Sequence, residues 1–160
     1  MFDQHFEDTF SQLFNDFCKN NQVQKMVQLL DSESSSESEI DFKYKKLFSF
    51  KERVKIFQDI HTKYPYKIPI IIEFANDDTM KPLKLVVDYD EIALTLLSRI
   101  RKVQKKVDFH KSVFILQDNN QPVILSKLVG DIYKEYLCSN YNYECDKILY
   151  LMVYTENTFG

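Results

Sequence analysis

Glycine is almost absent from this chain. Its 160 residues include only Gly130 and Gly160. The phosphate-binding loops of dinucleotide-binding and P-loop proteins need several glycines close together, because the backbone must approach the phosphates closely. The sequence therefore argues against both kinds of nucleotide site.

Long apolar runs are absent as well. No run approaches the roughly 20 residues that a membrane-spanning helix requires. The first residues also lack the basic segment followed by an apolar segment that is typical of a secretory signal. We therefore expect a cytoplasmic protein.

Cysteines are few and do not form a metal-binding pattern. Cys18, Cys138 and Cys145 are odd in number, and their spacing is not that of zinc ligands. We therefore expect reduced thiols, with no metal and no cofactor. No local pattern pairs a cysteine with a general base, so we do not expect an enzyme.

Charge is distributed unevenly along the chain. Residues 1–41 carry nine acidic and two basic residues, a net charge of −7. Residues 42–160 carry 15 acidic and 19 basic residues, a net charge of +4. This small positive charge lacks the dense basic cluster of nucleic-acid-binding proteins, so we expect no nucleic-acid partner.

Composition divides the chain into three segments. Residues 1–30 are predicted to be a helical extension, because Phe and Leu recur there at steps of three and four. Residues 31–43 are predicted to be an acidic linker rich in Ser and Glu that is disordered, because it has too few apolar residues to bury. Residues 44–160 are predicted to be the folded domain.

The folded domain is predicted to alternate helices and strands. A helix over 50–64 has Ser49 as N-cap and Glu52 in a capping box. The following elements are predicted to be strands over 68–74 and 83–89, a helix over 90–102, a strand over 112–117, a helix over 128–137 and a strand over 148–154. Pro69 is expected at an edge or first strand position.

The last strand is predicted to be central. Residues 148–154 form a continuous apolar run, which is typical of a strand buried on both faces. Two strands, a helix and two further strands follow the order of the ubiquitin-like β-grasp roll, in which the last strand lies parallel to the first. We therefore predict an α+β fold, with N-terminal helices packed on a four-stranded mixed sheet.

Two stretches carry a specific resemblance. They are Tyr64-Pro65-x-Lys67-Ile68-Pro69 and Glu156-Asn157-Thr158-Phe159-Gly160. With further matches over residues 44–160, the chain resembles the GABARAP-type ubiquitin-like modifiers of autophagy.

The resemblance implies conjugation through Gly160. In this family a cysteine protease trims the tail, an activating enzyme adenylates the glycine and a conjugating enzyme carries it as a thioester. The acyl group then passes to phosphatidylethanolamine, which places the protein on the autophagosome membrane. Thr158 and Phe159 would be recognised by these enzymes, while the modifier supplies no catalytic group.

The resemblance also implies that the edge strand over 84–88 binds partner peptides. Such peptides, from cargo receptors or adaptors, carry an aromatic residue and, three positions later, an aliphatic one. The first pocket, for the aromatic side chain, would comprise Ile56, Ile60, Pro69, Ile71, Lys84, Val86 and Leu149. The second pocket would comprise Leu85, Val87, Leu96 and Ile100. Lys67 and Arg101 would face acidic residues of the peptide.

The chain departs from the family pattern at the second pocket. Asp88 and Glu91 stand where Pro and Leu are usual, and Arg99 occupies another position that is usually apolar. These departures imply a partner preference that differs from that of typical members.

The helical extension contains a sequence of the partner type. Residues 7–13 place Phe10 after two acidic residues and Leu13 three positions beyond it. We hypothesise that this segment contacts the docking surface of its own or a neighbouring molecule.

Two other functions remain open at this stage. One is the second autophagy modifier of ubiquitin-like fold, which attaches to a protein lysine. The other is a ubiquitin-like scaffold that is never conjugated. Replacing Gly160 by Ala distinguishes the scaffold from the conjugated modifiers, because only a conjugated protein needs that glycine.

Overall fold

We describe the protein from a computed structural model, in which residues 40–103, 111–140 and 144–157 are described. Predictions on the helical extension, most of the linker and residues 158–160 lie outside these ranges. The described chain divides into two compact units. One contains residues 40–132 and 146–157 of the described ranges, and the other contains residues 133–140, 144 and 145.

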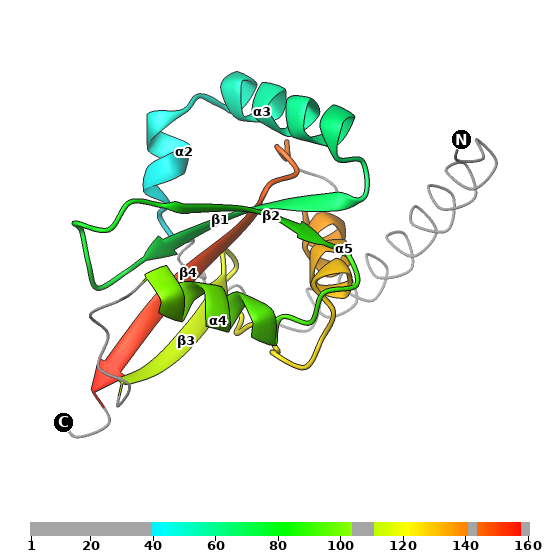
Figure 1. Ribbon diagram of the computed structural model, residues 1–160. Helices are drawn as coiled ribbons and strands as arrows, with labels where there is room; N and C mark the ends of the chain where they lie inside the picture. Colours follow the sequence, from blue (N-terminus) through cyan, green and yellow to red (C-terminus); the bar gives the residue numbers. More distant parts are fainter. Residues whose placement is uncertain (1–39, 104–110, 141–143, 158–160) are drawn as a thin grey trace, which may run out of the picture. The chain divides into compact units, whose positions relative to one another are not determined.

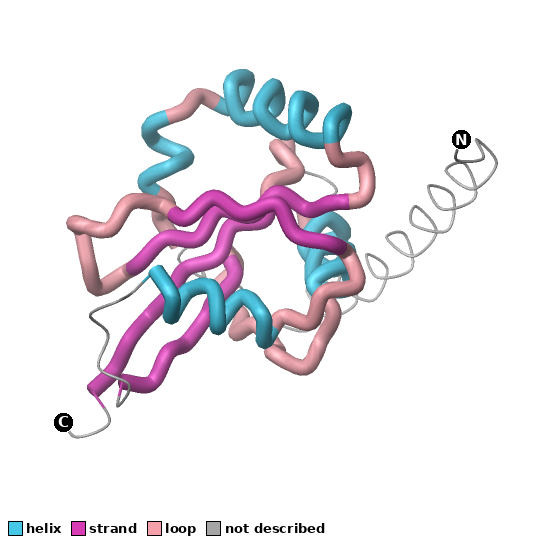
Figure 2. The backbone as a smooth tube through the Cα atoms, viewed as in Figure 1, coloured by secondary structure: helices cyan, strands magenta, loops and turns pink. Residues whose placement is uncertain are grey.

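The larger unit is built on a four-stranded mixed sheet (Figures 1 and 2). Its strands are β1 (Lys67–Phe74), β2 (Leu83–Asp88), β3 (Lys111–Gln117) and β4 (Leu149–Asn157). They are ordered β2-β1-β4-β3, with β1 and β4 parallel and the two outer pairs antiparallel. The predicted α+β fold with a central last strand parallel to the first is confirmed.

Pro69 lies where its missing N–H does not interrupt the sheet. It is the third residue of β1 and faces Val86 of β2. The ladder between β1 and β4 begins one residue later, at Ile70 and Leu149. At Pro69 the strand therefore has a neighbour on one side only, which is the situation that proline tolerates.

Helices α2 (Lys43–Leu47) and α3 (Phe50–Lys63) lie on one face of the sheet, and α4 (Leu94–Val103) lies on the other (Figure 1). The predicted capping box at the start of α3 is present, with Ser49 Oγ accepting from Glu52 N and Glu52 accepting from Ser49 N. Hydrogen bonding from Ser49, above all from its backbone N–H, lowers the pKa of Glu52. No residue of α3 is fully buried, so its apolar side chains are only half-covered or exposed.

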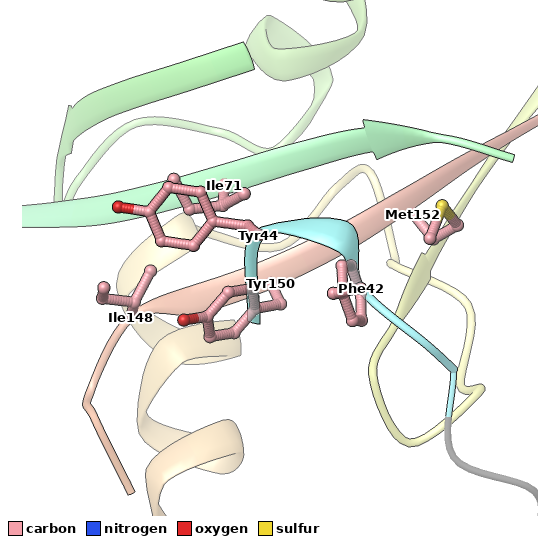
Figure 3. Packing of buried hydrophobic residues seen from close by; sticks show 6 residues of the cluster. All are labelled: Phe42, Tyr44, Ile71, Ile148, Tyr150 and Met152. Carbon is pink, nitrogen blue, oxygen red and sulfur yellow. The ribbon is translucent and has the colours of Figure 1, made fainter. Parts of the chain in front are cut away.

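A cluster of large side chains holds α2 to the sheet. Phe42 and Tyr44 come from the start of α2, and their rings lie against the ring of Tyr150 in β4 (Figure 3). Ile71, Ile148 and Met152 complete the cluster. Phe42 is 1% exposed, so the folded core includes a residue that the sequence pattern assigns to the linker.

The opposite face of the sheet has its own core. The register places Ile68, Ile70 and Ile72 of β1 beside Val87, Leu85 and Leu83 of β2. Helix α4 buries Leu96 and Ile100. These three isoleucines share one face, and Pro69 and Ile71 point to the other, because successive strand residues point to opposite faces.

Helix α4 begins later than predicted. The sequence predicts a helix from about Asp90, whereas α4 starts at Leu94. Ala93 N donates to Lys127 O and Leu94 N donates to Leu125 O, so this segment pairs with a distant loop before the helix begins. The predicted start of the helix was wrong because the periodicity of apolar residues carries no information on hydrogen bonds to distant residues.

Helix α5 (Val129–Ser139) spans the boundary between the two units. Cys138 in the smaller unit is disulfide-bonded, whereas Cys145 is not part of a disulfide. The prediction that all three cysteines are reduced is therefore wrong, since an odd number of cysteines still allows one disulfide. None of the helices in the described ranges is long and apolar enough to cross a membrane.

Candidate functional site

Strand β2 forms one edge of the sheet, and the predicted docking residues lie around it. Ile71 pairs with Lys84 and Pro69 pairs with Val86, so these four side chains share the face that carries α3. Val86 is 37% exposed, and Lys84 is exposed as well. The structure thus brings together the β1 and β2 residues of the predicted first pocket.

Helix α3 supplies the other side of this group. Ile56 is half-buried and packs against the cluster that contains Ile71. Ile60, one turn further along, is also half-buried. Because α3 buries no side chain completely, both isoleucines keep apolar surface exposed above the sheet.

Two lysines bring positive charge to the same face. Lys84 Nζ lies 5.7 Å from the ring centroid of Tyr44 and 6.0 Å from that of Phe48, which are cation–π distances. Lys67 Nζ lies 3.5 Å from Asp88 Oδ1 in an exposed pair. Exposed pairs of this kind are weak, so the Lys67 ammonium remains available to an acidic ligand.

Leu149 does not join this group. It pairs with Ile70 in the parallel ladder and therefore lies on the α4 face, whereas Ile71 lies on the α3 face. Ile148, which directly precedes β4, is 1% exposed and belongs to the same cluster as Ile71. The resemblance places the residue one position too far along the chain, and one position along a strand moves a side chain to the other face.

The second predicted group lies across the sheet from the first. Leu85 and Val87 point to the α4 face, where α4 buries Leu96 and Ile100. Val87, Leu96 and Ile100 are each at most 1% exposed, while Leu85 is half-buried. A ligand would therefore reach this group at Leu85 and at the residues around it.

A charged pair stands beside this second group. Arg99 Nη2 donates a 2.6 Å hydrogen bond to Glu91 Oε1. Glu91 is held at the end of β2, because its N–H donates to Asp88 O and its carbonyl accepts from Val129 N. The structure therefore joins two of the three residues that depart from the family pattern.

Arg101 also lies on α4, where it is half-buried. It makes no ion pair with the residues in the described ranges. It lies on another element than Lys67, and its contact with an acidic ligand stays a prediction.

The structure also contains a cavity that the sequence did not indicate. It measures about 390 Å³ and shares no residue with the two predicted groups. Its lining comes from the segment before and within α2, from the end of β1 and from β4, and includes Lys43, Glu73, Asp78 and Tyr154. Glu73 is already satisfied, since it accepts from the backbone N–H groups of Lys43 and Tyr44.

No metal site accompanies these features. The described residues include no cluster of three or more His, Cys, Asp or Glu side chains that could hold a metal ion. Thr158, Phe159 and Gly160, which the sequence predicts to be the conjugation tail, lie outside the described residues. They directly follow β4, the central strand that ends at Asn157.

Comparison with known proteins decides the family. The chain is 32% identical to autophagy-related protein 8h of Arabidopsis thaliana over 120 residues, which cover 73% of this chain and 94% of the plant protein. It is also 32% identical over 120 residues to autophagy-related protein 8 of Schizosaccharomyces pombe. These residues cover 73% of this chain and 93% of the yeast protein. The chain belongs to the autophagy-related protein 8 family.

A solved structure agrees with this assignment. The crystal structure of Trypanosoma brucei ATG8 matches with a TM-score of 0.58 at 27% identity, covering 76% of this chain and all of the other. No family model matches the chain. The resemblance to GABARAP-type modifiers is confirmed, and with it the expectation of a ubiquitin-like protein of autophagy that is not an enzyme.

Proposed function

We propose that this protein is conjugated through the Gly160 carboxylate to phosphatidylethanolamine and recruits partner proteins through the edge of its sheet at β2. Its partners would be cargo receptors or adaptors that carry an aromatic residue and, three positions later, an aliphatic one. The observation that carries the docking proposal is that the two predicted groups lie on opposite faces of the sheet beside its edge strand.

Strand geometry explains why two faces are needed. An extended peptide that adds to β2 places successive side chains on alternate faces. Residues three positions apart are an odd number apart, so they point to opposite faces. An aromatic side chain over Ile71 and Val86 therefore directs the later residue toward Leu85 on the α4 face.

Charge supports the same orientation. Lys67 and Lys84 lie on the α3 face, where the aromatic residue would bind. Acidic residues that precede the aromatic residue would meet these ammonium groups. Such contacts contribute mainly to association rate and orientation, because exposed ion pairs add little affinity.

The conjugation proposal rests on family membership and on the tail sequence. Thr158, Phe159 and Gly160 match the family's terminal residues. A tail-processing cysteine protease, an activating enzyme and a conjugating enzyme would act on this tail. Glycine suits their clefts because it lacks a Cβ atom and tolerates backbone conformations that other residues avoid. The protein would be cytoplasmic before conjugation and bound to the autophagosome membrane afterwards.

Reconstitution tests the conjugation proposal. The full chain is mixed with the activating and conjugating enzymes, ATP and liposomes that contain phosphatidylethanolamine, and the Gly160→Ala variant serves as control. We expect a lipid adduct of the unchanged chain only. An adduct to a protein lysine would support the other autophagy modifier, and no adduct with any acceptor would support an unconjugated scaffold.

A further inference from the structure

We propose that an aliphatic patch, formed by Ile92, Leu94, Ile124 and Leu128, is the docking site for a short helix that residues 23–30 of the same chain form. The patch shares no residue with the two predicted docking groups, so this inference goes beyond the proposed function. Its occupant lies outside the described residues, and we identify it by its sequence and by the point at which it joins the described chain.

Two segments that are distant in the sequence form the patch. An antiparallel bridge joins Ile92 to Leu128, and Leu94 N donates a 3.0 Å hydrogen bond to Leu125 O. These contacts hold the loop before α5 against the start of α4 (Figure 1). Because residues that face each other in an antiparallel bridge point to the same side, the side chains of Ile92 and Leu128 lie together.

The patch is exposed although it is apolar. Ile92 is 47% exposed, Leu94 52%, Ile124 51% and Leu128 39%, whereas Ala93 is buried. The chain thus turns the small side chain of Ala93 inward and the large ones of Ile92 and Leu94 outward. One exposed aliphatic residue needs no explanation, but four in one place indicate a surface that another apolar element covers.

Residues 23–30 have the sequence of such an element. Their apolar residues stand at positions i, i+3, i+4 and i+7, which is one face of a helix. These residues are Val23, Met26, Val27 and Leu30. A helix this short is unstable alone in water, because it makes few hydrogen bonds for the cost of its first turn. It therefore needs an apolar surface on which to pack.

The point of attachment brings this segment within reach of the patch. Ile40 N, at the start of the described chain, donates a 3.4 Å hydrogen bond to Asp118 O. Asp118 precedes Ile124 by six positions, so the two lie at most ~20 Å apart. The linker of residues 31–39 spans up to ~30 Å when it is extended. A helix that ends at Leu30 can therefore reach Ile124 without any change in the described fold.

Charge favours this segment over the rest of the extension. Asp90, two positions before Ile92, is exposed and makes no ion pair with a described residue. Residues 23–30 carry one charge, the cation of Lys25, whereas residues 1–16 carry four acidic residues. The patch therefore repels residues 1–16 more than residues 23–30. The contact hypothesised for residues 7–13 is a separate one.

Trypsin digestion of the full chain tests the inference, because Lys25 lies within the proposed helix. A docked helix is cut only when it opens, so the rate of cleavage after Lys25 reports how often it leaves the patch. We expect roughly tenfold faster cleavage in the variant Leu94→Asp with Ile124→Asp. Leu47→Asp with Tyr66→Asp adds the same charges at exposed positions elsewhere and should leave the rate unchanged. Equal rates in the unchanged chain and the patch variant overturn the inference.

Cross-linking identifies the occupant and does not depend on the stability of the patch variant. A photo-reactive phenylalanine analogue replaces Ile124 in the full chain, and mass spectrometry locates the residues that it joins. We expect cross-links to residues 23–30 of the same chain. Cross-links to a second copy, to residues 1–22 alone or to no residue of the extension overturn the inference.

Variants of the segment provide a matched control for the cross-link. Val27→Asp with Leu30→Asp places two charges on the apolar face of the proposed helix and should abolish the cross-link. Gln24→Asp with Gln28→Asp places the same charges on its polar face and should keep the cross-link. Loss of the cross-link in both double variants, or in neither, overturns the assignment of the apolar face to the patch.

Discussion

Arg53 Nε lies 2.7 Å from Asp146 Oδ2 and joins α3 to the residue that stands three positions before β4. The two side chains are 12% and 4% exposed. Asp146 also accepts from the Tyr150 hydroxyl at 2.6 Å and from Ile148 N, while Arg53 donates to the carbonyls of Lys45 and Phe48. This network ties α2 and α3, which carry one side of the docking surface, to the central strand.

Breaking this buried pair should destabilise the fold strongly. Asp146→Asn leaves the Arg53 guanidinium buried without its counter-charge, so we expect a loss of about 3 kcal/mol in the free energy of unfolding. Asp41→Asn is the control, because its pair with Lys46 is mostly exposed and should contribute less than about 1 kcal/mol. Urea unfolding of both variants gives the comparison, and equal losses would refute the role of the buried network.

Much of the fold can be predicted from local signals. The capping box at Ser49 and Glu52, the alternation along β2 and the continuous apolar run of β4 each depend on residues close in sequence. These signals fix the type and order of the elements, and the structure agrees with them. They also suffice to place Lys84 and Val86 on one face of β2.

The remaining features depend on contacts between distant residues. The start of α4 is set by bonds to residues 125–127, and Arg53 meets Asp146 across 93 positions. Whether Ile148 or Leu149 lies beside Ile71 depends on the register between β1 and β4, which neither strand specifies alone. The family resemblance marks Glu91 and Arg99 as departures, but the sequence does not show that they form a pair.

Alkaline pH should unfold the protein partly through its buried tyrosines. Burial, with the hydrogen bond to Asp146 and that carboxylate's charge, raises the pKa of Tyr150 above its ordinary value, and burial raises the pKa of Tyr44 and Tyr89. The folded state therefore keeps protons that the unfolded state releases above about pH 10, and stability falls as pH rises past this value.

Urea unfolding between about pH 8 and pH 11 measures this slope. Tyr150→Phe should make the slope shallower, since it removes one titrating group. It should also cost about 1 kcal/mol at the lower pH, because Asp146 loses a hydrogen bond. Tyr64→Phe is the exposed control, and an identical slope in both variants would contradict the assignment to Tyr150.

Gly130 should not tolerate a side chain. A Cβ atom at this position would lie 2.7 Å from the backbone oxygen of Tyr89, which also accepts the Gly130 N–H hydrogen bond. Backbone atoms cannot move aside as a flexible side chain can, so Gly130→Ala should lower the free energy of unfolding by about 1–3 kcal/mol. Lys55→Ala, at an exposed position of α3, is the control and should change it little. Unchanged stability of Gly130→Ala would show that the turn can relax.

A charge on the docking edge should weaken peptide binding without unfolding the chain. Val86→Asp places a carboxylate at a partly exposed position on the α3 face, where the aromatic residue is proposed to bind, and we expect roughly tenfold weaker binding. Phe114→Ser on β3, the opposite edge of the sheet, is the control and should keep the affinity. Equal loss in both variants would indicate a general effect on the sheet, and loss only in Phe114→Ser would place the docking site at the other edge.

Residues 7–13 provide the last prediction, which concerns a segment outside the described residues. If Phe10 and Leu13 contact the proposed docking surface, they compete with partner peptides, because both use the same two groups. The double variant Phe10→Ala with Leu13→Ala should then bind a partner peptide more tightly than the unchanged chain does. Titration of both proteins, with Phe2→Ala and Phe6→Ala as the control pair, measures this effect. Unchanged affinity would show that this segment does not compete with partner peptides. Equal gains of affinity in both double variants would assign the effect to the helical extension as a whole.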